Sequence, residues 1–79
     1  VYTVRMTSDF YAKLGKNIKL RRKALGLTQQ QLADKMDISL NFMGKIEVAF
    51  SKPSLDTLID FAAALDTTVS DLTNFDNEN

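Results

Sequence analysis

Residues 28–47, TQQQLADKMDISLNFMGKIE, constrain the fold most strongly, because they predict two short helices with little chain between them. Thr28 is a favourable N-cap, and Gln31 stands three residues later, which is the spacing of a capping box. The next apolar residues repeat with the period of one helical face until Asp37, a residue type that tolerates the left-handed backbone conformation. Ser39 then begins a second helix. We therefore expect two helices joined by a tight turn.

The second of these helices has two unlike faces. Its apolar residues Met43 and Ile46 face inward by the helical period. The residues expected on the outer side are Leu40, Asn41, Gly44 and Lys45. Two short helices arranged in this way have the layout of a helix-turn-helix, whose second helix can lie in the major groove of DNA.

Apolar periodicity predicts three further helices. A long first helix is capped by Ser8 or Asp9 and ends at Gly26, where a left-handed residue is favourable. Ser54 caps the fourth helix, and Ser70 caps a short fifth helix that carries the apolar side chain of Leu72. The stripes expected to be buried are Tyr11, Leu14, Ile18 and Leu25 in the first helix and Leu55, Leu58, Ile59, Ala62 and Leu65 in the fourth.

A chain of 79 residues has room for one domain with one small core. We expect an all-α domain of five helices at residues 9–74, between an N-terminal arm at 1–8 and an acidic tail at 75–79. The alternating residues of the arm also fit an edge strand at a dimer contact, or residues ahead of a start at Met6. No apolar run approaches the roughly 18 to 20 residues that cross a bilayer, and no signal-peptide pattern is present. We expect a soluble, cytoplasmic protein.

Charge is divided unevenly along the chain, although the net charge is zero. Residues 1–52 hold ten basic and four acidic residues, a net charge of +6, whereas residues 53–79 hold six acidic and no basic residues, a net charge of −6. This division fits a basic surface that meets phosphate and an acidic surface that faces away, and it equally fits two ordinary solvated faces. The densest basic cluster is Lys13, Lys16, Lys19, Arg21, Arg22 and Lys23.

The residue types exclude most catalytic chemistry. The chain has no His and no Cys, which excludes histidine-based triads, thiol chemistry, disulfides and the usual zinc ligands. The carboxylates are scattered, and Gly15, Gly26 and Gly44 do not form a phosphate-binding loop. We expect no enzymatic activity, no cofactor, no metal and no small-molecule ligand.

Three segments carry a family resemblance: LGKNIKLRRKALGLTQQQLA, DISLNFMGKIE and KPSLDTLIDFAAALDTTVSDL. In this order and spacing they resemble the phage-repressor and Cro-like helix-turn-helix regulators, also called the xenobiotic-response-element family. Within that family, the chain is similar to restriction-modification controller proteins and to small phage or plasmid repressors. The resemblance implies a compact, five-helix, lambda-repressor-like fold with the helix-turn-helix at helices 2 and 3.

The same resemblance implies contacts with double-stranded DNA. Asn41 can pair with adenine, Lys45 can donate to guanine, and Leu40 can touch a thymine methyl group; the alternative is that all three are ordinary exposed helix residues. Ser39 can act only as a cap, and Phe42 can instead rest on the preceding helix. The residues expected at the phosphates are Gln29, Ser39, Phe42 and Lys52.

Arg22 and Glu47 match family positions that commonly form a structural ion pair, which would fix the angle of the second helix of the motif. Val48 and Ala49 depart from the family pattern, which has a polar residue and a glycine there. Either the helix ends differently, or the loop that continues to Phe50 has gained a binding role. Gly44 inside the helix implies a close approach, either of DNA or of the preceding helix.

The resemblance further implies a homodimer that binds a palindromic operator and acts as a transcriptional regulator. The residues expected at the dimer interface are Phe50, Phe61, Val69 and Phe75, all of which can alternatively complete the core. A second hypothesis is a protein-interaction module, such as an antitoxin or an adaptor, that uses the same scaffold to bind a partner protein. The apolar loop at residues 48–50 favours that hypothesis.

Overall fold

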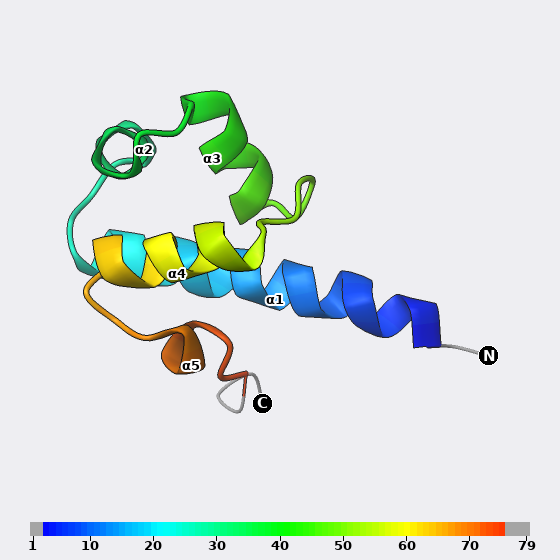
Figure 1. The fold of residues 1–79 in the computed structure, drawn as a ribbon. Helices are drawn as coiled ribbons and strands as arrows, with labels where there is room; N and C mark the ends of the chain where they lie inside the picture. Colours follow the sequence, from blue (N-terminus) through cyan, green and yellow to red (C-terminus); the bar gives the residue numbers. More distant parts are fainter. Residues whose placement is uncertain (1–2, 76–79) are drawn as a thin grey trace.

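The computed structural model describes residues 3–75, and this part of the chain folds into five helices without strands (Figure 1). The helices are α1 (Thr3–Ala24), α2 (Gln29–Met36), α3 (Leu40–Glu47), α4 (Leu55–Ala64) and α5 (Val69–Leu72). The predicted all-α, five-helix fold is therefore confirmed. None of these helices within residues 3–75 is both long enough and apolar enough to cross a bilayer.

The long helix α1 runs across the whole molecule and supports the other elements (Figure 1). Helices α2 and α3 lie on one side of it, and α5 lies on the opposite side. Helix α1 contacts α3 and α5, while α2 contacts α3 and α4. The two helices of the predicted helix-turn-helix therefore pack on each other and are held from below by α1 and α4.

Side-chain caps define the ends of α2 and α3 as the sequence predicts. The Thr28 hydroxyl accepts a hydrogen bond from the Gln31 backbone N–H at 3.0 Å, and the Gln31 side-chain oxygen accepts one from the Thr28 N–H at 2.8 Å. Asp37 ends α2 in the left-handed conformation, with φ 57°. The Ser39 hydroxyl then accepts from the Phe42 N–H at 3.0 Å. The capping box, the turn and the second cap are all confirmed.

Helix α1 begins earlier than predicted. It starts at Thr3 rather than at a cap at Ser8 or Asp9, so residues 3–8 continue the helix instead of forming an arm or an edge strand. Residues 3–8 contain neither glycine nor proline, so nothing in them stops the helix. Residues 1–2 and most of the predicted tail, 76–79, lie outside the described part of the chain.

Helix α5 also begins earlier than predicted. Its N-cap is Thr68, whose hydroxyl accepts a hydrogen bond from the Asp71 N–H at 3.0 Å, whereas Ser70 lies inside the helix. Thr68 has the extended backbone that an N-cap requires, and its side chain reaches the N–H three residues on.

The core differs from prediction mainly in the rotation of α4. Leu58, Phe61, Ala62 and Leu65 are buried, and they follow the spacing i, i+3, i+4, i+7 of one helical face. This face turns Leu55 and Ile59 outward, which were expected to be buried and are instead 67% and 49% exposed. Leu25 was also expected in the core but is exposed after the end of α1. The buried apolar residues outside α4 are Leu14, Ile18, Leu32, Ala33, Met43, Ile46 and Leu72.

Gly15 allows α1 to pack directly against the C-terminal end of α3. A Cβ atom at this position would lie 2.6 Å from the carbonyl oxygen of Ile46 and 2.6 Å from that of Glu47. Real Cβ atoms do not approach backbone oxygens so closely. Since both obstructing atoms belong to the backbone, they cannot rotate away as a side chain could, and the absence of a side chain at Gly15 sets the position of α3.

We predict that Gly15→Ala lowers the free energy of unfolding by about 1 to 3 kcal/mol, the usual cost of an overpacked core. Urea denaturation followed by circular dichroism would measure it. Gly44→Ala is the matched control, because a Cβ there meets no atom within 4 Å and should not destabilise the protein. Equal stability of Gly15→Ala and the wild type would show that the contact with α3 is not tight.

Candidate nucleic-acid interface

Helix α3 presents the predicted polar face to the outside. Leu40 is 44% exposed, Asn41 is exposed, and Lys45 is half-buried. Met43 and Ile46, on the opposite side, are fully buried. The outer face of α3, which we define as Leu40, Asn41, Gly44 and Lys45, therefore carries one amide, one ammonium group and one apolar side chain within two helical turns.

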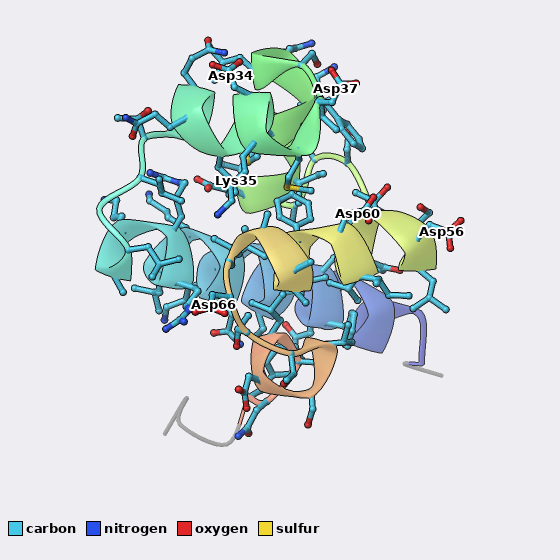
Figure 2. The ribbon with its side chains drawn as sticks, turned by 60° about the vertical axis from the view of Figure 1, so that its left-hand side comes forward. Asp34, Lys35, Asp37, Asp56, Asp60 and Asp66 are labelled. Atoms are coloured by element: carbon cyan, nitrogen blue, oxygen red, sulfur yellow. The ribbon has the colours of Figure 1, made fainter. Side chains whose placement is uncertain are left out.

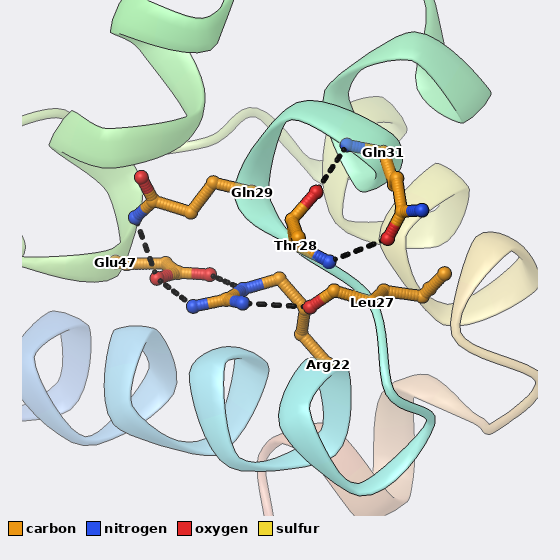
Figure 3. Close-up of polar contacts among 6 residues, drawn as sticks. All are labelled: Arg22, Leu27, Thr28, Gln29, Gln31 and Glu47. Atoms are coloured by element: carbon orange, nitrogen blue, oxygen red, sulfur yellow. Dashed lines mark hydrogen bonds and ion pairs between the residues drawn. The ribbon is translucent and has the colours of Figure 1, made fainter.

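A buried ion pair between Arg22 of α1 and Glu47 of α3 holds this helix in place (Figure 3). The Arg22 Nε donates to one carboxylate oxygen of Glu47 at 2.6 Å, and Nη2 donates to the other at 3.1 Å. The remaining nitrogen, Nη1, donates to the carbonyl oxygen of Leu27 at 2.8 Å. Both side chains are almost completely buried. The predicted structural ion pair is confirmed, and it is bidentate.

Gln29 extends this network in a way that the sequence did not indicate. Its Nε2 donates to the Glu47 carboxylate at 2.9 Å, so the first turn of α2 is tied to the last turn of α3 (Figure 3). Gln29 was predicted to contact a phosphate. One of its amide hydrogens is used within the protein, and the second remains available for that contact, which stays a prediction. This bond could not be predicted from the sequence, because no spacing in the sequence shows where Glu47 lies in space.

We predict that Arg22→Met lowers the free energy of unfolding by about 3 to 5 kcal/mol, because it leaves the Glu47 carboxylate buried without its cation. The double variant Arg22→Met/Glu47→Leu should recover most of this loss, since it removes both charges. Urea denaturation of the wild type, both single variants and the double variant forms a complete cycle. A loss below about 1 kcal/mol in Arg22→Met would contradict a buried, structurally required pair.

The other predicted phosphate contacts have different environments. Ser39 caps α3, and Phe42 is half-buried and packs against the core, while the phosphate contacts of both residues stay predictions. Lys52 is exposed, and its ammonium group lies 5.4 Å from the centre of the Tyr11 ring of α1. This cation–π contact draws the loop after α3 towards the long helix.

The loop after α3 is unusually apolar and exposed. Val48 is 73% exposed and Phe50 is 77% exposed. The Lys45 ammonium group lies 5.6 Å from the centre of the Phe50 ring, which places this aromatic side chain beside the outer face of α3. Ala49, between Val48 and Phe50, adopts φ 64°. This is the left-handed conformation, for which the family pattern has a glycine. The helix therefore ends with the usual backbone conformation despite the unusual residue.

We predict that Ala49→Gly raises the free energy of unfolding by about 1 kcal/mol, because glycine adopts a positive φ without the steric cost that alanine has. Ala12→Gly is the matched control. It makes the same substitution at an exposed position inside α1 and should lower the free energy of unfolding by about 1 kcal/mol. If both variants lose stability in thermal denaturation, the Ala49 backbone is not strained.

The predicted dimer-interface residues fall into three environments. Phe61 was wrongly predicted, because it is fully buried on the side of α4 that faces the core. Val69 and Phe75 are half-buried, and the Phe75 ring makes an edge contact with Phe10 at 5.4 Å between ring centres. Phe50 is free of the core. The sequence prediction did not identify Leu55 and Ile59 as exposed apolar residues of α4, because it assigned both to the buried stripe.

Acidic side chains gather on the side of the molecule that α2 and α4 present in Figure 2. They come from both halves of the chain, so the division of charge along the sequence corresponds only partly to a division in space. Lys35, which lies among them, donates to the Ala64 carbonyl oxygen at 2.7 Å and so satisfies the C-terminal end of α4. The labelled acidic residues are Asp34, Asp37, Asp56, Asp60 and Asp66.

The chain is similar in sequence to known helix-turn-helix proteins. Residues 18–72, more than half of the chain, match the Helix-turn-helix family model. The transcriptional repressor RstR of the cryptic phage CTXphi from Vibrio cholerae is 33% identical over 60 residues, which span 76% of this chain and 54% of that protein. The immunity repressor protein of Bacillus phage phi105 is 44% identical over 57 residues, 72% of this chain and 40% of that protein. The chain thus spans about half the length of these relatives.

A solved structure is similar over most of its length. The crystal structure of the restriction-modification controller protein C.AhdI from Aeromonas hydrophila superposes with a TM-score of 0.76 and 29% sequence identity. The match covers 78% of this chain and 94% of that chain. The fold of this chain is therefore shared with a restriction-modification controller protein.

Proposed function

Because the chain belongs to the helix-turn-helix family of phage-repressor and Cro-like regulators, we propose that it binds double-stranded DNA sequence-specifically and regulates transcription. The observation that carries this proposal is the outer face of α3, where Leu40 and Asn41 are exposed and Lys45 is half-buried. The inner side of the helix, with Met43, Ile46 and Glu47, is buried. Helix α3 enters the major groove, whose width admits an α-helix.

Three side chains on that face suit different base edges. Asn41 pairs with adenine through its amide, Lys45 donates to the acceptors of guanine, and Leu40 meets a thymine methyl group. Each good pair discriminates against a wrong base by roughly 1 to 3 kcal/mol. The exposed Lys52 and the remaining amide hydrogen of Gln29 donate to phosphate oxygens on either side of the helix.

We further propose that the protein acts as a homodimer on a palindromic operator. A recognition helix of eight residues reads only a few base pairs, so two copies about one DNA turn apart, roughly 34 Å, are needed for a specific site. Leu55 and Ile59 lie one turn apart on the exposed side of α4 and supply apolar surface for such a contact. Phe50, Val69 and Phe75 are the further candidates.

A second candidate function is binding of a partner protein through the loop that follows α3. The observation that favours it is the high exposure of Val48 and Phe50, two apolar side chains of the same loop. An antitoxin or an adaptor would use the helix-turn-helix as a scaffold for this surface. Variants of the loop and of α3 distinguish the two functions.

The direct experiment is a selection of random DNA duplexes on the purified protein, followed by a salt titration of the selected sequence. An inverted repeat with half-sites about one turn apart, and an affinity that falls steeply with salt, supports the dimeric regulator. A weak interaction that ignores sequence would contradict the proposal.

We predict that Asn41→Ala and Lys45→Ala each weaken binding to the selected duplex at least about tenfold, while both variants keep their fold. Lys35→Ala is the matched control for the lost charge, since the Lys35 ammonium group reaches the C-terminal end of α4 and not the outer face of α3 (Figure 2). Fluorescence anisotropy would measure affinity and circular dichroism the fold. An unchanged affinity in both α3 variants, with loss of a partner protein in Phe50→Ser, would favour the second function.

A further inference from the structure

Gly44 occupies the middle of the outer face of α3, where nothing within the described residues requires a glycine. A Cβ atom built at this position meets no atom within 4 Å. The alternative expectation, that Gly44 lets α2 approach closely, is therefore wrong. Gly44 differs in this respect from Gly15, where a Cβ atom would collide with two backbone oxygens.

The backbone conformation does not explain this glycine either. Gly44 lies inside the regular helix α3 and has no positive φ, unlike Gly26 after α1. Glycine inside a helix is unfavourable relative to alanine, because it loses more conformational freedom on folding. Helix α3 therefore carries a residue that weakens it, at a position where the isolated fold has room for a Cβ atom.

The neighbours of Gly44 indicate what the missing side chain makes room for. Gly44 is three residues after Asn41 and four after Leu40, so the three share one helical face. Lys45 adjoins them. A side chain at position 44 would project between the groups that we propose to reach DNA. Gly44 itself is half-buried, with open space where a Cβ atom would lie.

We infer that Gly44 is a DNA-contact position, at which an edge of the major groove lies directly against the backbone of α3. This inference rests on the proposed DNA-binding function and adds a residue that sets how deeply the helix enters the groove. A side chain here would hold α3 away from the groove and weaken the contacts of Asn41 and Lys45 together. The glycine thus reduces stability of the free protein and increases affinity for DNA.

The test compares Gly44→Ala and Gly44→Leu with the wild type, using the duplex that the wild-type protein selects. Alanine and leucine are strong helix formers, so both variants should raise the melting temperature, by up to about 4 to 8 °C. Affinity should fall at least about tenfold for alanine and further for leucine. Opposite signs of the two effects would not arise from a purely structural role.

Ser70→Ala is the control substitution. It replaces an exposed residue of α5, on the opposite side of the molecule from α3 (Figure 1), with a better helix former, and it should leave DNA affinity unchanged. A fresh selection with Gly44→Ala identifies the edge of the groove. A changed base at one position of each half-site indicates a base contact, whereas the same sequence bound more weakly indicates the sugar–phosphate backbone.

Two results overturn the inference alone. They are a wild-type protein that binds specifically together with an equally tight Gly44→Ala variant, and a Gly44→Ala variant that is less stable than the wild type. Absence of any sequence-specific binding by the wild type overturns the proposed function, and the inference with it. Failure of the inference and failure of the function are therefore distinguishable.

Discussion

The buried contact between Arg22 and Glu47 is the interaction on which the arrangement of the motif depends. The guanidinium group joins α1 to the end of α3 and also holds the carbonyl oxygen of Leu27 in the loop before α2. Gln29 adds a bond from α2 to the same carboxylate. No buried side-chain nitrogen or oxygen within residues 3–75 lacks a hydrogen-bond partner, as burial of two charges requires, since an unpaired buried charge is far more costly than a missing surface bridge. The Glu47 carboxylate therefore links α1, α2 and α3.

A helix of eight residues has little stability of its own, so its orientation must come from its surroundings. For α3 these surroundings are the ion pair at its C-terminal end, the close approach of Gly15 beneath it, and the burial of Met43 and Ile46. All of them act on the inner side. The residues of the outer face do not hold α3 in place. They can therefore differ between proteins that recognise different DNA sequences.

Local signals in the sequence predicted most of the motif. The orientation of α4 and the contacts between distant residues could not be predicted, because they depend on how the helices pack. The caps at Thr28 and Ser39 and the two faces of α3 depend on neighbouring residues and were correct. Helix α4 is apolar around most of its circumference, so periodicity alone could not decide whether Ile59 or Phe61 faces the core. The bond from Gln29 to Glu47 joins residues that meet only after α2 and α3 have packed together.

Contact between α3 and DNA can be tested directly by titrating the ¹⁵N-labelled protein with its selected duplex and following the backbone amide signals by NMR. The largest changes are expected at residues 39–45 and at Gln29, with little change in α5. Changes concentrated at Val48 and Phe50, or spread evenly over the basic residues of α1 while α3 stays unaltered, would contradict recognition by the outer face of α3.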